Sequence, residues 1–181
     1  MKRYGAGFFV SPCLLAMALA APVSPQELAG GKLLVATEKS RDADFARSVI
    51  FLIQFDRQAA LGVMVNRRSS VPVSEVFPDL KSAPGGSDPV YTGGPVTVGI
   101  RALLRSPSGD VSVISTRTSL VKLAASGKPS SVFRVYAGYT GWTAPQLQDE
   151  LARGLWRILP GDANAVFDAH PETLWRRLMD H

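Results

Sequence analysis

The sequence contains almost no cysteine or histidine. Among its 181 residues the only thiol is Cys13, and the only imidazoles are His170 and His181. Protein zinc and iron sites combine several Cys, His or carboxylate ligands, and neither histidine belongs to a metal-binding spacing. We therefore expect no metal, and no other cofactor, because a phosphate-binding P-loop and a dinucleotide fingerprint are also missing. Since Cys13 lies in a segment that we expect to be removed, disulfides are excluded as well.

The sequence also lacks a recognisable nucleophile. It has no G-x-S-x-G motif, and His170 stands directly before Pro171, at the predicted start of a helix, where a capping or surface role is the simpler interpretation. Asp42 and Asp44 form a candidate carboxylate pair, although a solvated loop in which Asp44 caps the following residues is the simpler interpretation. No catalytic residue is predicted. An enzyme of unrecognised class that uses carboxylates and Arg67 remains an alternative.

The excess of basic residues is small and scattered. Lys and Arg number 20 against 15 Asp and Glu, which is a formal charge of +5. Without Lys2 and Arg3, which lie in the expected leader, the balance is 18 against 15, or +3. Surfaces that bind nucleic acid usually gather their basic residues on one face or helix. Nucleic acid is therefore not expected as a partner of an exported protein, and a nucleic-acid-linked transcriptional regulator is an alternative only for a cytoplasmic one.

The first 21 residues have the three-part pattern of a signal peptide. Lys2 and Arg3 precede an apolar stretch at 8–19, and Ala18-Leu19-Ala20 provides a cleavage site. The apolar stretch is too short to span a bilayer. We therefore expect removal of residues 1–21, a linker at 22–27 and a single domain at 28–181, periplasmic or secreted and without a membrane span. Translation from Met17 would instead leave a cytoplasmic protein.

The hydrophobic pattern predicts an α+β fold, with a mostly antiparallel sheet and a few packed helices. Several short strands are joined by tight turns, and the helices come mostly late in the chain. We predict strands at 32–36, 48–55, 61–65, 91–96, 100–105, 111–115, 131–137 and 155–159, and helices at 73–80, 118–126, from 144 and from 171. The helix at 73–80 is interrupted by Pro78.

The stretch around Gly138, Gly141 and Trp142 organises the rest of the chain. The strand at 131–137 is expected to end at these glycines. Thr143 then caps a helix and forms a capping box with Gln146. Apolar side chains at 147, 151 and 155 recur every four residues and predict one apolar helix face. We expect Trp142 to be buried where the strand meets this helix.

Several short motifs occur in a fixed order. They are Asp44-Phe45, Ser48-Val49-Ile50, Gly62 to Asn66-Arg67, Gly93-Gly94-Pro95-Val96, Gly138-Tyr139-Thr140-Gly141-Trp142 with Gln146-Leu147 and Glu150-Leu151, and finally Trp156 and Phe167. This series resembles the YqgE/AlgH family of bacterial proteins over nearly the whole chain after the linker. The resemblance implies a compact α+β domain from a family without an established biochemical activity, in which some members carry a transcriptional-regulator label.

The candidate site residues are Asp44, Asn66, Arg67, Gly93, Gly94 and Glu150. Backbone N–H groups of Gly93 and Gly94 could bind an anion, although a tight chain reversal is the simpler interpretation. Arg67 serves either as a binding-site arginine or as an ion-pair partner of Asp44 or Glu150. We expect Arg67 to face the Gly93-Gly94 bend. The sequence thus predicts a non-enzymatic binding or regulatory domain for an unknown small ligand or protein partner.

Overall fold

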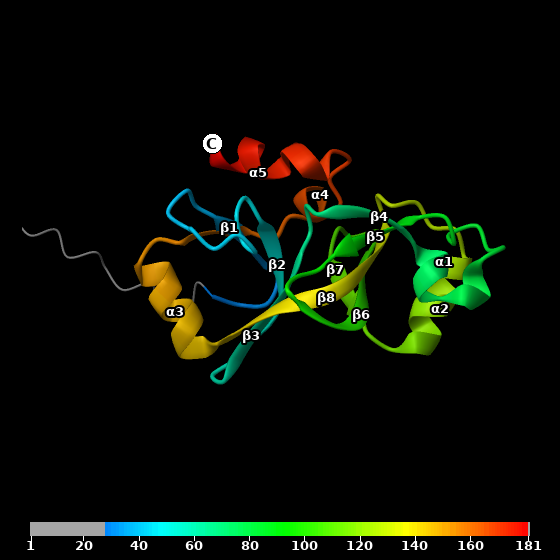
Figure 1. Ribbon diagram of the computed structural model, residues 1–181, viewed down its shortest axis with the longest axis horizontal. Helices are drawn as coiled ribbons and strands as arrows, with labels where there is room; N and C mark the ends of the chain where they lie inside the picture. The colour runs from blue at the N-terminus through cyan, green and yellow to red at the C-terminus, as the bar shows by residue number, and fades with distance from the viewer. Residues whose placement is uncertain (1–27, 181) are drawn as a thin grey trace, which may run out of the picture.

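The computed structural model describes residues 28–180 (Figure 1). The expected signal peptide at 1–21, the linker at 22–27 and His181 lie outside the described residues. Within the described part the chain forms one mixed sheet with helices packed on both of its faces. This architecture confirms the α+β domain that the sequence predicts. No helix among residues 28–180 is long and apolar enough to cross a membrane.

Nine strands form the sheet. They are β1 (Lys32–Ala36), β2 (Val49–Phe55), β3 (Ala59–Met64), β4 (Arg68–Pro72), β5 (Pro89–Thr92), β6 (Val96–Arg105), β7 (Val111–Ile114), β8 (Phe133–Thr143) and β9 (Trp156–Pro160). The order is β4-β5-β8-β3-β2-β1-β9, and β6 pairs with both β7 and β8. Only β5 and β8 pair in parallel, so the expected antiparallel character is confirmed.

The helices lie mostly in the second half of the chain. They are α1 (Val73–Val76), the 3-10 helix η1 (Pro78–Leu80), α2 (Arg117–Ala125), α3 (Ala144–Ala152), α4 (Ala163–Val166) and α5 (Pro171–Met179). Pro78 separates α1 from η1, as the sequence predicts. The Thr143 side chain accepts the Gln146 N–H, which confirms the N-cap, but the Gln146 side chain bonds to Glu150 instead of completing a capping box.

The long strand β8 corrects the expected boundary at residue 137. Gly138 has φ of +76° and a Cβ there would meet the Val96 carbonyl oxygen at 2.6 Å, so glycine permits a close backbone crossing in mid-strand. The strand then continues to Thr143 and pairs with β3, with Gly141 opposite Leu61. Trp142 is 4% exposed and directly precedes Thr143, the N-cap of α3, which confirms its predicted burial where the strand meets the helix.

Two elements have no clear sequence signal. β4 has a polar sequence and only an irregular pairing with β5, so it forms because its neighbour offers a backbone edge. The four-residue helix α4 is too short for a hydrophobic period, and it begins where the Asp162 side chain accepts the Asn164 N–H.

Both faces of the sheet are covered near β1. Leu33 and Val35 point to one face and pack with residues of α4 and α5, whereas Leu34 and Ala36 point to the other and pack with α3. Figure 1 shows α5 lying beside β1 on one side of the domain, with α1 and α2 at the far end. The turn between β1 and β2 therefore lies next to α5.

Candidate functional site

The 42–48 loop (residues 42–48) is the second part of the connection from β1 to β2 and is held mainly by hydrogen bonds among its own residues. The Asp42 carbonyl oxygen accepts the Phe45 N–H, and the Asp42 side chain accepts the Asp44 N–H. The Phe45 carbonyl oxygen accepts both the N–H and the hydroxyl of Ser48, which is buried. Asp44 itself is exposed. The predicted loop is therefore present, with Asp42 rather than Asp44 as its capping residue.

Asn66 and Arg67 fasten this loop to the end of β3. The Asn66 side chain accepts the Val49 N–H at 2.8 Å and donates to the Arg47 carbonyl oxygen at 2.9 Å. Arg67 Nη2 donates to the Ala46 carbonyl oxygen at 3.3 Å. No ion pair joins Arg67 to Asp44 or Glu150 within residues 28–180. The two predicted site residues therefore shape the neighbouring loop.

Glu150 reaches the same loop through three aromatic rings. Its Oε2 atom accepts the indole N–H groups of Trp142 at 3.0 Å and of Trp156 at 2.7 Å. Phe45 packs on both indoles, with centroid distances of 5.8 Å and 5.5 Å. The carboxylate thus orients the two tryptophans, and the tryptophans anchor Phe45.

Backbone hydrogen bonds hold the segment around Gly93 and Gly94 next to Arg67. The Thr92 N–H donates to the Arg67 carbonyl oxygen, and the Met64 N–H donates to that of Gly93. The Gly93 N–H donates to the Ala137 carbonyl oxygen at 2.7 Å, so this amide is used by the sheet and does not face an anion. A Cβ on Gly94 would collide with the backbone of Tyr139. These glycines permit a close approach to the backbone of β8, an arrangement that differs from the tight chain reversal suggested by the sequence.

The loop presents Arg47 to Trp175 of α5. Arg47 is the one non-glycine residue with positive φ, +56°, in the described part of the chain. Its guanidinium carbon lies 5.8 Å from the centroid of the Trp175 ring. The Trp175 indole N–H donates to the Ala36 carbonyl oxygen at 2.7 Å, which fixes the ring against β1. A strained, exposed loop position and a fixed, partly buried aromatic ring thus lie side by side at the surface.

Two surface cavities share Arg47 and Trp175. The first, about 340 Å³, is completed by Thr37, Glu38, Ser40 and Ala46. The second, about 150 Å³, is completed by Glu172, Thr173 and Arg176. We call this region the Arg47–Trp175 surface. Because both cavities are lined by the same two residues, they adjoin each other at this pair.

A larger cavity of about 500 Å³ lies elsewhere, between Leu28, the β2–β3 turn and the start of α3. Its lining is mostly apolar, and the Asp56 carboxylate in it already accepts hydrogen bonds from Gln54, Gln58 and Ala59. These bonds lower the pKa of Asp56. The Asp56 carboxylate is therefore occupied by the local turn, and none of the predicted site residues lines this cavity.

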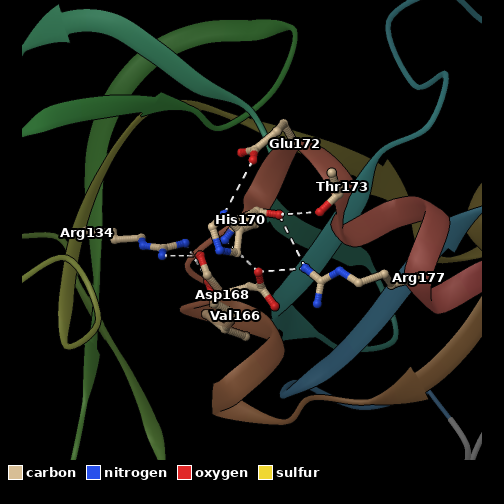
Figure 2. Close-up of polar contacts among 7 residues, drawn as sticks. All are labelled: Arg134, Val166, Asp168, His170, Glu172, Thr173 and Arg177. Atoms are coloured by element: carbon tan, nitrogen blue, oxygen red, sulfur yellow. Dashed lines mark hydrogen bonds and ion pairs between the residues drawn. The ribbon is translucent and has the colours of Figure 1, made fainter.

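A separate polar cluster positions α5, as Figure 2 shows. The buried Arg134 guanidinium donates to the carbonyl oxygens of Ser130, Val166 and Asp168, at 2.8, 3.1 and 2.6 Å. The Asp168 carboxylate accepts from Arg177 at 2.7 Å and from the His170 N–H at 2.8 Å. Partial burial acts to raise the pKa of Asp168, but these hydrogen bonds and the Arg177 charge outweigh burial and hold it below its usual range. The chain leading into α5 is thus fixed on both sides.

His170 is exposed at the N-cap of α5, 3.8 Å from Glu172, in agreement with the surface role that its position predicts. Residues 28–180 contain no group of three or more His, Cys, Asp or Glu side chains that could hold a metal ion. The predicted catalytic alternative required Asp44, Arg67 and Glu150 in one pocket. Instead, Arg67 contacts the Ala46 carbonyl oxygen and Glu150 contacts two indoles.

Sequence reasoning missed Arg47, Trp175 and Arg176. The motifs at 44–45 and 48–50 flank Arg47, but nothing in them indicates a left-handed backbone at an arginine. Trp175 lies on the predicted C-terminal helix, and its ring packs partly against the core. Its place in the lining of two cavities depends on the position of α5 relative to the 42–48 loop.

Three kinds of comparison agree on the relatives of this chain. The model of the AlgH-like family matches residues 33–181. A UPF0301 protein of Streptomyces coelicolor is 33% identical over 162 residues, covering 82% of this chain and 84% of that protein. One from Azoarcus sp. is 34% identical over 153 residues, covering 77% and 81%. The solution structure of the AlgH protein from Pseudomonas aeruginosa superposes with a TM-score of 0.69 and 28% identity, over 87% of this chain and 89% of that one.

Proposed function

The chain belongs to the AlgH-like family, and we propose that it is a non-enzymatic binding domain that acts through the Arg47–Trp175 surface. The proposal is carried by the backbone of Arg47. A left-handed conformation costs an L-residue roughly 1–2 kcal/mol, a cost that glycine would avoid. Strained non-glycine residues cluster at ligand-binding and switch sites, where the side chain is required. The presence of arginine instead of glycine at this position is explained if the guanidinium group binds a partner molecule.

The surroundings of Arg47 support this interpretation. Its own carbonyl oxygen and that of Ala46 accept hydrogen bonds from Asn66 and Arg67, and Phe45 is anchored by the two tryptophans that Glu150 orients. Loops that bind ligands are commonly held in place by a rigid scaffold. The predicted residues Asn66, Arg67 and Glu150 would then support the site, while Arg47 and Trp175 contact the partner.

Binding fits this surface better than catalysis. The two cavities contain no histidine or cysteine, and the carboxylates that line them, Glu38 and Glu172, are exposed. Catalytic acids and bases are usually tuned by burial or by a close charged neighbour. A domain that binds a partner without catalysing a reaction acts by altering the activity or the location of that partner. The proposal therefore includes a regulatory role. It also places the mature protein outside the cytoplasm, which the leader pattern at 1–21 supports.

Arg47→Gly tests the proposal without disturbing the loop, because glycine adopts positive φ freely. The test immobilises wild type, Arg47→Gly and the control Arg57→Gly and exposes each to an extract of the compartment where the mature protein resides. Mass spectrometry then quantifies the components that each protein retains. Arg57 is exposed and lines the larger cavity, so the control also tests that location. We expect Arg47→Gly alone to lose a component. Equal retention by wild type and Arg47→Gly would overturn the proposal.

A further inference from the structure

Building on the proposed function, we infer that the Arg47–Trp175 surface binds an extended segment of a partner protein, in which a carboxylate side chain adjoins an apolar one. The carboxylate would meet Arg47, and the apolar side chain would lie on the Trp175 ring. The charges, the shape and the residue types of the surface lead to this partner chemistry.

The arginines of this surface have no carboxylate partner. Within residues 28–180 neither Arg47 nor Arg176 takes part in an ion pair, as holds for most arginines of this part of the chain, so both guanidinium groups are free to bind a carboxylate. A guanidinium binds a carboxylate through two parallel hydrogen bonds, which gives direction as well as attraction. Two guanidinium groups that line one cavity, one of them over an aromatic ring, are therefore a recognition feature for a carboxylate.

The acidic residues of the surface limit the charge of the partner. Glu38 lines the first cavity, and Glu172 lines the second, close to the His170 ring at 3.8 Å. Glu38 and Glu172 balance Arg47 and Arg176, while Arg67 is turned to the Ala46 carbonyl oxygen. A polyanion such as nucleic acid would be repelled by the glutamate in each cavity. A segment with only one carboxylate, placed at Arg47, fits better because it meets less repulsion from the two glutamates.

The shape favours a chain over a compact small molecule. Arg47 and Trp175 line both a cavity of about 340 Å³ and a cavity of about 150 Å³, so a ligand that uses both cavities must pass over this pair. Small-molecule sites instead enclose most of the ligand in one concavity. Trp and Arg are also the residue types that dominate binding energy at protein–protein interfaces.

The test is selection of peptides from a displayed library of random short sequences on the mature protein. We expect enrichment of peptides with Asp or Glu beside Leu, Phe or Trp. Their synthetic forms should bind at least about tenfold more weakly to Arg47→Gly, as for a lost charged anchor. Arg57→Gly should bind them like wild type. Glu172→Gln should bind them more tightly, since it removes a repelling charge, a change that a merely structural role of Glu172 would not produce.

Enrichment of basic or purely apolar peptides, or no enrichment sensitive to Arg47→Gly, would overturn the inference. Inorganic phosphate and citrate are titrated in parallel. If these anions bind in an Arg47-dependent manner and no peptide does, the segment is wrong while the proposed binding function stands. If native components are also retained equally by wild type and Arg47→Gly, the proposed function fails too.

Discussion

The Oε2 atom of Glu150 lies 2.7 Å from the indole nitrogen of Trp156, and the same oxygen accepts the indole N–H of Trp142. One carboxylate on α3 thus joins β8, β9 and, through Phe45, the 42–48 loop. Each indole N–H is part-buried, so removal of the shared acceptor leaves two donors without a partner.

We expect Glu150→Ala to lower the free energy of unfolding by about 2–4 kcal/mol. This is the cost of leaving two indole N–H donors without an acceptor, reduced by the hydrogen bonds that water can form with them. Glu150→Gln keeps an acceptor oxygen and should cost less than Glu150→Ala. Urea unfolding followed by tryptophan fluorescence measures both variants. Identical midpoints for Ala and Gln would show that the carboxylate does not hold the tryptophans.

Two threonines near the end of β8 should respond oppositely to the same substitution. The Thr140 hydroxyl is fully buried and has no hydrogen-bond partner among residues 28–180. Thr140→Val should therefore leave stability unchanged or raise it by about 1 kcal/mol. The Thr143 hydroxyl caps α3, so Thr143→Val should cost about 1 kcal/mol. Urea unfolding midpoints of the two variants test both predictions. A large loss of stability in Thr140→Val would contradict the first and indicate that the Thr140 hydroxyl bonds to a buried water.

The acid sensitivity of the domain should depend on Asp168. Its folded-state pKa is lowered, so the folded protein binds fewer protons there than the unfolded chain does. This stability is present above the unfolded pKa, about 3.9, and is lost as pH falls through the folded value. Asp168→Asn should therefore cost stability at neutral pH, and the difference from wild type should shrink as the pH approaches 3.

Urea midpoints of wild type and Asp168→Asn across this pH range measure the effect. Asp180→Asn is the matched control, because Asp180 is an exposed carboxylate that follows α5. A difference that stays constant with pH would mean that the hydrogen bonds from Arg177 and the His170 amide act without linkage to protonation. It would contradict the pKa shift assigned to Asp168.

We also predict that the mature protein begins near Ala21, because the basic, apolar and cleavage parts of a leader occur in order. Intact-mass and N-terminal peptide measurements on protein from the producing cell test this prediction. A cytoplasmic protein that starts at Met17 would contradict export and make the nucleic-acid alternative the one to pursue.

Much of the fold follows from local sequence. The apolar run at 48–55 predicts β2, the turn at 106–110 predicts the β6–β7 hairpin, and Thr143 predicts the start of α3. These features act within a few residues, through periodicity, turn chemistry and capping. β4 and the continuation of β8 beyond Gly138 were not predicted, because they depend on backbone neighbours from distant parts of the chain.

The candidate site divides in the same way. The sequence alone determined the α+β class, the family likeness and the scarcity of metal ligands, and it selected Asn66, Arg67 and Glu150 as candidates. Only the tertiary structure decided their roles, because a hydrogen bond between residues such as Asn66 and Arg47 forms once β3 and the 42–48 loop are side by side. The pairing of Arg47 with Trp175 joins residues 128 positions apart, and no local pattern records so distant a contact.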